Sequence, residues 1–130
     1  MLSKQTSHLV LALTDPQLSE TIREAFLQES FQVSVAANGE EAIRILSGDR
    51  RIHLLLIDSD LPGLNGYETV QYLRASGFSN LIVMLMAWFN IQSLAAANLV
   101  GCDEFIAKPV DVANLLTTAR QQLLFHPENL

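Results

Sequence analysis

The sequence predicts an α/β domain with a doubly wound, five-stranded parallel sheet and five helices. Two observations predict this fold. Short apolar runs alternate five times with segments that have helical spacing, and most runs are continuously apolar instead of alternating in polarity. Continuous apolar runs are typical of strands that are covered on both faces. Repeated strand–helix units favour an open sheet with right-handed crossovers and helices on both sides.

Five apolar runs are predicted to form the strands of this sheet. Each is four to six residues long and precedes a helical segment. In order, the predicted strands are HLVLAL (8–13), QVSVA (32–36), IHLLLI (52–57), LIVMLM (81–86) and EFIA (104–107).

A helix is predicted after each strand. Asp15-Pro16 begins the first, because a capping residue is followed by a proline at a position that needs no amide hydrogen. Asn38-Gly39 and Asn65-Gly66 are predicted to be turns before the second and third helices. The apolar stripes of the five helices are Leu18, Ile22, Ala25 and Phe26; Ala42, Ile43 and Leu46; Tyr67, Val70, Leu73 and Arg74; Ile91, Leu94, Ala95 and Leu99; and Val112, Leu115, Leu116, Ala119 and Leu123.

Length and composition indicate one domain over 1–130, with a core at about 8–124 and a linker or tail at 125–130. A net charge of −6 argues against direct binding of nucleic acid by this domain. The single cysteine, Cys102, excludes a disulfide framework and a site of four cysteines. No membrane-spanning run or signal peptide is recognised, so we expect a cytoplasmic protein without a membrane partner.

The residues at the strand ends are the candidate functional residues, because ligands of such sheets bind beyond the carboxyl ends of the strands. The segment HLLLIDSDLPGLNG (53–66) runs from a strand into two carboxylates, Asp58 and Asp60, and then to Pro62-Gly63. The residues at the other strand ends are Thr14-Asp15, Met86-Ala87 and Lys108-Pro109.

From about His8 to Leu124 the chain resembles the receiver domain of two-component response regulators. The segment IDSDLPGLNGYE (57–68), the triplet AKP (107–109) and the strand–helix spacing between them carry the resemblance. It implies a flavodoxin-like fold with strand order 2-1-3-4-5. It also implies a signalling domain and not an enzyme, beyond self-phosphorylation and self-dephosphorylation.

The resemblance implies roles for individual residues. Asp58 matches the phosphoacceptor, which would take a phosphoryl group from a histidine kinase or a histidine phosphotransfer protein. Lys108, whose bond to Pro109 would be cis, matches the lysine that stabilises the phosphoryl group. Asp15, Asp58 and the backbone carbonyl of Asp60 match the ligands of Mg²⁺, which prefers hard oxygen donors.

Two positions, Thr14 and Met86, depart from the family pattern, and Phe105 is a less common residue at a third. Thr14 replaces the first member of an acidic pair, so Mg²⁺ binding should weaken, although its hydroxyl could still bind metal-bound water. Met86 stands where a Ser or Thr usually contacts the phosphoryl group, and a thioether is no donor. Phe105, at the aromatic switch position, lacks the hydroxyl of the commoner tyrosine. The expected site is therefore weakened and atypical.

Simpler interpretations remain open beside these roles. Asp58 and Asp15 could be ordinary caps, and Lys108 a solvated lysine. Trp88, on the predicted site rim with Thr14, Ala87 and Pro109, could contact a partner or pack over the site with Phe89. The second candidate function is therefore a phosphorylation-independent interaction module, for which another copy of the chain is one candidate partner.

A flavin-binding protein of the same topology is a more remote alternative. Such a site needs a phosphate-binding loop after the first strand, with amide hydrogens that face the anion. The corresponding segment is TDPQLS (14–19), where Asp15 would repel a phosphate and Pro16 has no amide hydrogen.

Overall fold

The computed structural model describes residues 7–48 and 51–125, which form one parallel sheet of five strands with five helices. The strands lie in the order β2-β1-β3-β4-β5, which confirms the predicted fold class and strand order. From the N-terminus the elements are β1 (His8–Ala12), α1 (Pro16–Gln28), β2 (Gln32–Ala36), α2 (Gly39–Leu46), β3 (Leu54–Asp58), α3 (Gly66–Ala75), β4 (Leu81–Met86), α4 (Ile91–Val100), β5 (Glu104–Ala107) and α5 (Val112–Phe125).

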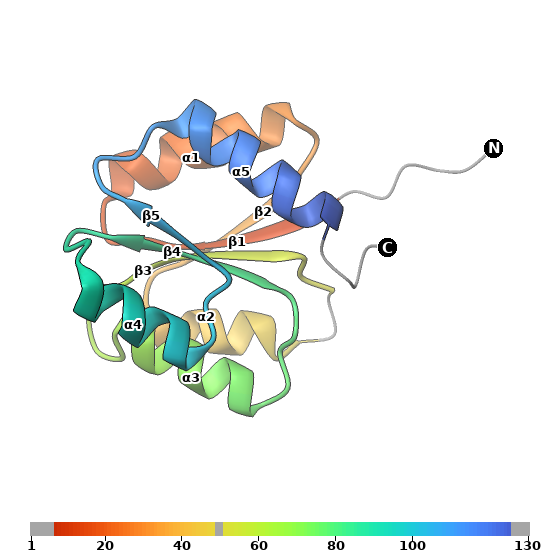
Figure 1. The fold of residues 1–130 in the computed structure, drawn as a ribbon. Helices are drawn as coiled ribbons and strands as arrows, with labels where there is room; N and C mark the ends of the chain where they lie inside the picture. The colour runs from red at the N-terminus through yellow and green to blue at the C-terminus, as the bar shows by residue number, and fades with distance from the viewer. Residues whose placement is uncertain (1–6, 49–50, 126–130) are drawn as a thin grey trace.

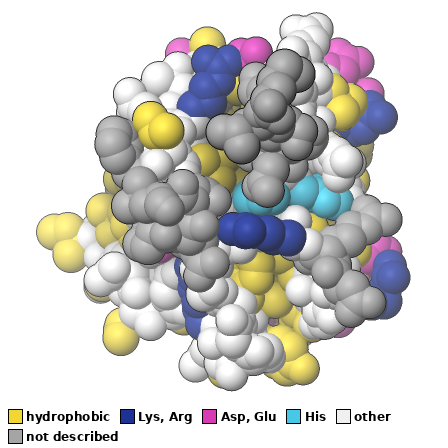
Figure 2. All heavy atoms as spheres, turned by 90° about the vertical axis from the view of Figure 1, so that its right-hand side faces the viewer, with side chains coloured by type: hydrophobic (Ala, Val, Ile, Leu, Met, Phe, Trp, Pro, Cys, Tyr) yellow, Lys and Arg dark blue, Asp and Glu magenta, His cyan; other side chains and the backbone are white. Residues whose placement is uncertain are grey.

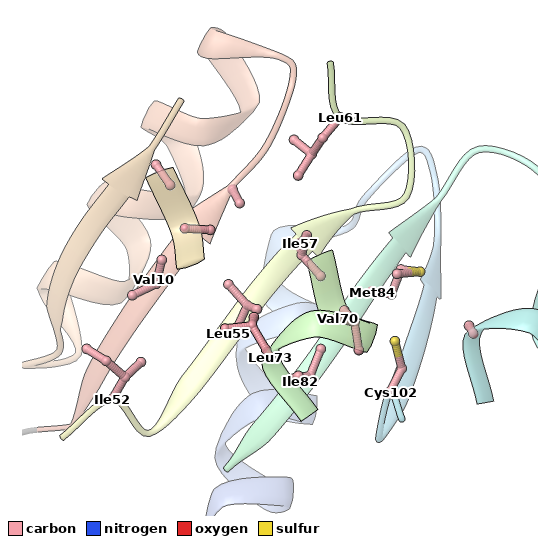
Figure 3. Close-up of a cluster of buried hydrophobic side chains, with 14 of the residues drawn as sticks. Val10, Ile52, Leu55, Ile57, Leu61, Val70, Leu73, Ile82, Met84 and Cys102 are labelled. Carbon is pink, nitrogen blue, oxygen red and sulfur yellow. The ribbon is translucent and has the colours of Figure 1, made fainter. Parts of the chain in front are cut away.

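The helices cover both faces of the sheet, α1 and α5 on one side and α2, α3 and α4 on the other (Figure 1). Two buried clusters correspond to these layers. Ile22, Phe26 and Leu115 belong to the cluster under α1 and α5. Val70 and Leu73 of α3 belong to the other cluster, where they pack over strand residues (Figure 3). Burial on both faces explains why the strands are continuously apolar in sequence.

Side-chain caps begin the first four helices. Asp15 caps α1 and accepts from the amides of Gln17 and Leu18. Asn38 caps α2, and Asn65 caps α3 through a capping box with Glu68. The predicted turns at Asn38-Gly39 and Asn65-Gly66 were therefore assigned wrongly. In each pair the asparagine is an N-cap and the glycine is the first residue of the helix.

The boundaries of two strands, β1 and β3, differ from the prediction. β3 is Leu54–Asp58, so it begins two residues later than the apolar run and includes the carboxylate at its end. β1 ends at Ala12 instead of Leu13. Strand ends depend on where pairing stops, and the polarity of the residues alone does not determine that point.

The predicted apolar stripe of α4 is partly wrong. Ile91 and Leu99 are 85% and 86% exposed, whereas Ala97 is the buried residue of this helix. Leu94 and Val100 pack against the core beside it. The helix therefore presents a different face to the sheet from the one that the sequence predicted.

The remaining predictions about the chain concern its cysteine, its last residues and membranes. Cys102 is buried, and burial raises the pKa of its thiol to about 12, so the side chain acts as a small apolar residue. Helix α5 extends through Phe125, the first residue of the predicted linker or tail, and 126–130 lie outside the described residues. Within the described ranges, no helix is long and apolar enough to cross a bilayer.

Candidate functional site

The candidate site lies at the carboxyl edge of the sheet, where β3, β4 and β5 end side by side. Asp58 of β3 is paired with Leu85 of β4 in the parallel register. Two backbone hydrogen bonds continue this pairing into the loops, from Ser59 N to Leu85 O at 3.0 Å and from Lys108 N to Met86 O at 2.9 Å. The backbone therefore places Asp58 and Lys108 on neighbouring segments of the same edge.

Asp58 is a fully buried carboxylate with contacts from two other segments. Its exposed fraction is 0%, and Oδ1 lies 2.5 Å from Lys108 Nζ. Its Oδ2 accepts from the hydroxyl of Thr14 at 2.9 Å and from the amide of Thr14 at 3.2 Å. These contacts exclude the reading of Asp58 as a helix cap and of Lys108 as a solvated lysine. A buried charge is tolerated when it is paired in this way.

The two oxygens of Asp58 differ in their surroundings. The described residues donate no hydrogen bond of favourable geometry to Oδ1, although Lys108 Nζ is close enough for an ion pair. Both hydrogen bonds go to Oδ2. An ammonium group attracts a carboxylate from many directions, so Lys108 Nζ at 2.5 Å interacts strongly with Oδ1. Oδ1 is therefore neutralised electrostatically and still available for bonding.

Gly66 allows α3 to begin against the backbone of Asp58. A Cβ at this position would lie 2.2 Å from Asp58 O and 2.8 Å from Ser59 Cα. The amide of Gly66 also donates to Ser59 O at 2.9 Å. The close approach explains the glycine after the capping Asn65. The pair Asn-Gly is visible in the sequence, but its usual meaning is a turn, so the sequence does not predict this close contact.

The residues around Asp58 fit a magnesium ion in chemical type. Asp58 supplies a buried carboxylate, and the two hydrogen bonds to the Asp15 carboxylate both go to Oδ1 of Asp15. Asp60 is exposed beside them, and its predicted contribution is a backbone carbonyl. The described residues contain no group of three His, Cys, Asp or Glu side chains that could hold a metal. Two carboxylates, a carbonyl and water would be a set of hard oxygen donors.

The two predicted switch positions lie on β4 and β5. Met86 ends β4 and is fully buried, so its thioether belongs to the core while its carbonyl holds Lys108 N. Phe105 is half-buried and borders a surface groove of about 500 Å³ between β5 and α5. Phe89 and Pro109 line the same groove.

The predicted rim is largely exposed. Thr14, Ala87 and Pro109 are exposed, and the Lys108–Pro109 bond is cis, as the resemblance implied. Trp88 is 76% exposed, so it does not pack over the site, and of the two alternatives weighed for it partner contact remains.

The sequence of the chain is similar to those of known response regulators. The profile of the response regulator receiver domain matches residues 10–120. The transcriptional regulatory protein CpxR of Escherichia coli is 30% identical over 112 residues, which are 86% of this chain and 47% of that protein. A cyclic di-GMP phosphodiesterase of Thermotoga maritima is 29% identical over 121 residues, 90% of this chain and 32% of that protein. The chain thus spans about a third to a half of the length of these curated relatives.

Solved structures show the same fold. A CheY-like receiver domain protein of Methanospirillum hungatei superimposes with a TM-score of 0.85 at 19% identity, covering 92% of this chain and 94% of that one. A response regulator described as putative, from Chloroflexus aurantiacus, has a TM-score of 0.83 at 25% identity, with 92% and 98% covered. Fold, strand order and the profile match over most of the chain agree, and the chain belongs to the response regulator receiver domains of two-component signalling systems.

Proposed function

We propose that the chain receives a phosphoryl group on Asp58 from a histidine kinase or a histidine phosphotransfer protein. One observation carries the proposal: a fully buried carboxylate at the carboxyl edge of the sheet has Lys108 Nζ 2.5 Å from one oxygen. A carboxylate in this position is a nucleophile, and the ammonium group offsets the repulsion between it and an incoming phosphoryl group.

The transfer is a displacement at phosphorus. A lone pair of an Asp58 oxygen forms an O–P bond while the P–N bond of a phosphohistidine breaks, and the imidazole keeps the electron pair. The product is an acyl phosphate. Lys108 then lies beside the oxygens of the transferred group, where its charge stabilises them.

Magnesium would be held by Asp15, Asp58 and the carbonyl of Asp60, where it would neutralise charge on the phosphoryl oxygens. Two features support a weakened site. Thr14 supplies a hydroxyl where the family usually has a carboxylate, and here the hydroxyl donates to Asp58 itself. Met86 supplies no hydroxyl for the phosphoryl group, because its side chain is a thioether, and that side chain is buried in the core.

The test is phosphorylation by acetyl phosphate in the presence of Mg²⁺, followed by intact-mass measurement. We expect one phosphoryl group on the wild-type chain and none on Asp58→Asn, because an amide is not a nucleophile of this kind. Removing Mg²⁺ with a chelator should slow the reaction. Asp111→Asn is the matched control: Asp111 caps the first turn of α5, and asparagine caps equally well.

A wild-type chain that stays unphosphorylated, or an Asp58→Asn variant that still gains the group, would contradict the proposal.

A second candidate, an interaction module that does not depend on phosphorylation, is favoured by apolar side chains that are exposed in the loop after β4 and along α4. Trp88, Ile91 and Leu99 are 76%, 85% and 86% exposed. Exposed apolar groups that cluster mark interaction surfaces. Light scattering of the unphosphorylated chain discriminates the two functions with the variants Trp88→Ala and Asp58→Asn. Self-association that Trp88→Ala reduces and Asp58→Asn leaves unchanged would favour this second candidate.

A further inference from the structure

We infer that Thr14 is a positioning residue, which holds Asp58 by Oδ2 and thereby leaves Oδ1 as the oxygen that attacks phosphorus. This inference rests on the proposed phosphoacceptor function. Its basis is an asymmetry between two oxygens that are chemically equivalent in a free carboxylate. Oδ2 accepts two hydrogen bonds, both from Thr14, and Oδ1 accepts none of favourable geometry from the described residues.

The hydrogen bonds of Thr14 restrict the rotation of the carboxylate. The hydroxyl and the amide of one residue approach the same oxygen at 2.9 and 3.2 Å, so Oδ2 has a fixed place at the end of β1. The Asp58 backbone is paired with β4 and lies against Gly66, so it cannot shift easily. Rotation of the carboxylate is therefore the main freedom left to this side chain, and the hydrogen bonds of Thr14 restrict it. Two donors to one oxygen also withdraw electron density from it, which makes Oδ2 the poorer nucleophile.

Lys108 makes Oδ1 the better placed oxygen. Its Nζ is 2.5 Å from Oδ1, so a phosphoryl group that bonds there comes directly under the ammonium charge. In the displacement, a lone pair of Oδ1 forms the O–P bond and the donor's leaving group takes the electron pair of the bond that breaks. Oδ2 becomes the carbonyl oxygen of the acyl phosphate, and as an acceptor it can keep both donors of Thr14. The contacts thus serve reactant and product without rearrangement.

The threonine at position 14 differs from the acidic residue usual in the family in two ways. It has no charge, and its hydroxyl donates a hydrogen bond to Asp58. A carboxylate there could accept hydrogen bonds but could not donate one to an ionised Asp58, and it would repel that group. Thr14 offers a donor at the same place. With threonine in place of an acid, position 14 contributes less to cation binding and instead orients the phosphoacceptor Asp58 directly.

The test compares two substitutions at position 14 in the full chain. Thr14→Val keeps the branched shape and the backbone amide but removes the hydroxyl, and Thr14→Ser keeps the hydroxyl. With saturating acetyl phosphate and Mg²⁺, we expect Thr14→Val to lower the maximal phosphorylation rate about ten-fold, because the Asp58 carboxylate loses a contact that orients Oδ1 toward the phosphoryl group. The acetyl phosphate concentration for half-maximal rate should stay unchanged, and Thr14→Ser should restore the rate to within about two-fold.

The matched control is Thr117→Val, in which an exposed threonine on α5 loses a hydroxyl that donates to Ala113 O. It should phosphorylate at the wild-type rate. A second readout does not depend on phosphorylation. The amide proton of Thr14 in the NMR spectrum of the unphosphorylated chain should move upfield in Asp58→Asn, because its acceptor then carries no charge, while the amide of Thr117 should not move.

Four possible results separate this inference from the proposed function. Thr14→Val that is phosphorylated as fast as wild type, or a Thr14 amide that does not respond to Asp58→Asn, overturns the positioning role and leaves Asp58 as the phosphoacceptor. Thr14→Val that is slow and is not rescued by Thr14→Ser also overturns it, since the hydroxyl is then not the cause. A wild-type chain without phosphorylation overturns both.

Discussion

Gly66 illustrates how one residue supports the candidate site without touching a ligand. It stands where α3 begins, so close to β3 that a Cβ would lie 2.2 Å from the carbonyl oxygen of Asp58. Since that oxygen belongs to the backbone, a side chain at position 66 can be accommodated only if the end of β3 or the start of α3 moves. The residue therefore connects helix packing to the position of the phosphoacceptor.

Gly66→Ala should destabilise the fold and slow phosphorylation of Asp58. Overpacking against backbone costs about 1–3 kcal/mol, and the displaced backbone carries Asp58 with it. Urea unfolding followed by circular dichroism measures the first effect, and intact mass during reaction with acetyl phosphate measures the second.

Gly48→Ala is the matched control for this prediction. A Cβ there would meet only Ile45 O, at 3.4 Å, so the free energy of unfolding should stay the same or rise by about 0.4–1 kcal/mol. Equal stabilities of the Gly66→Ala and wild-type chains would show that the contact at Asp58 O is not restrictive.

Individual residues of the site could be predicted to different extents. Asp58 and Lys108 follow from their places at strand ends and from the family resemblance, and the structure brings their charged groups together. The donation from Thr14 to Asp58 could not be predicted. It depends on how far the ends of β1 and β3 are offset along the sheet. The register between these two strands sets this offset, and no local sequence pattern reveals it.

Helix α4 shows at the scale of one element why a packing face can be predicted wrongly. Its sequence, IQSLAAANLV, contains no charged residue and has apolar side chains on several sides. The pattern therefore carries little directional information. The face against the sheet is the one with Leu94, Ala97 and Val100, and small Ala97 allows close approach, while Ile91 and Leu99 remain exposed.

Arg74 joins three elements at the opposite edge of the sheet from Asp58. Its guanidinium donates to the carbonyls of Gly101, Phe78 and Asn80 at 2.7–2.9 Å and to Oδ2 of Asp103 at 2.8 Å. The Arg74 side chain thus connects the end of α3 to the end of α4 and to the loop that precedes β4. The sequence placed Arg74 on an apolar stripe without a role, because its acceptors are distant in sequence and mostly backbone.

Arg74→Lys should lower the free energy of unfolding by about 1–3 kcal/mol, because a single ammonium group cannot reach four acceptors arranged around a planar fork. Urea unfolding should show a lower midpoint at an unchanged slope. Arg23→Lys is the control, since its pair with Glu20 is exposed and contributes little. If both variants unfold at the same midpoint, the Arg74 contacts do not stabilise the junction of these elements.

For the whole molecule, the sequence predicts the architecture better than the details at its edges. Alternating strands and helices, together with apolar runs buried on both faces, lead to a parallel sheet with two covering layers, as observed. The strand order came from the family resemblance. The edges carry the particular chemistry, namely Asp58 and Lys108 at the carboxyl ends of the strands, and Arg74 and a pair of histidines at the other edge.

The histidines at the amino edge couple the stability of the whole fold to pH. This edge faces the viewer in Figure 2, with the described histidines in cyan. His53 Nδ1 accepts from the amide of His8 at 2.9 Å, so that nitrogen must be unprotonated in the fold. Burial first, then the charge of Arg51 and the proximity of His8, lower the pKa of His53. The fold therefore favours the neutral ring.

Stability should consequently fall as the pH is lowered through the range below about 6.5, the ordinary pKa of histidine in an unfolded chain. There the unfolded chain binds a proton that His53 in the folded chain does not bind, so the free energy of unfolding decreases until the pH reaches the lowered folded pKa. His53→Asn provides an acceptor oxygen for the His8 amide but does not titrate. Urea unfolding of both chains from pH 8 to pH 5 should show the steeper loss in the wild type, and parallel curves would mean that His53 titrates alike in the folded and unfolded chains.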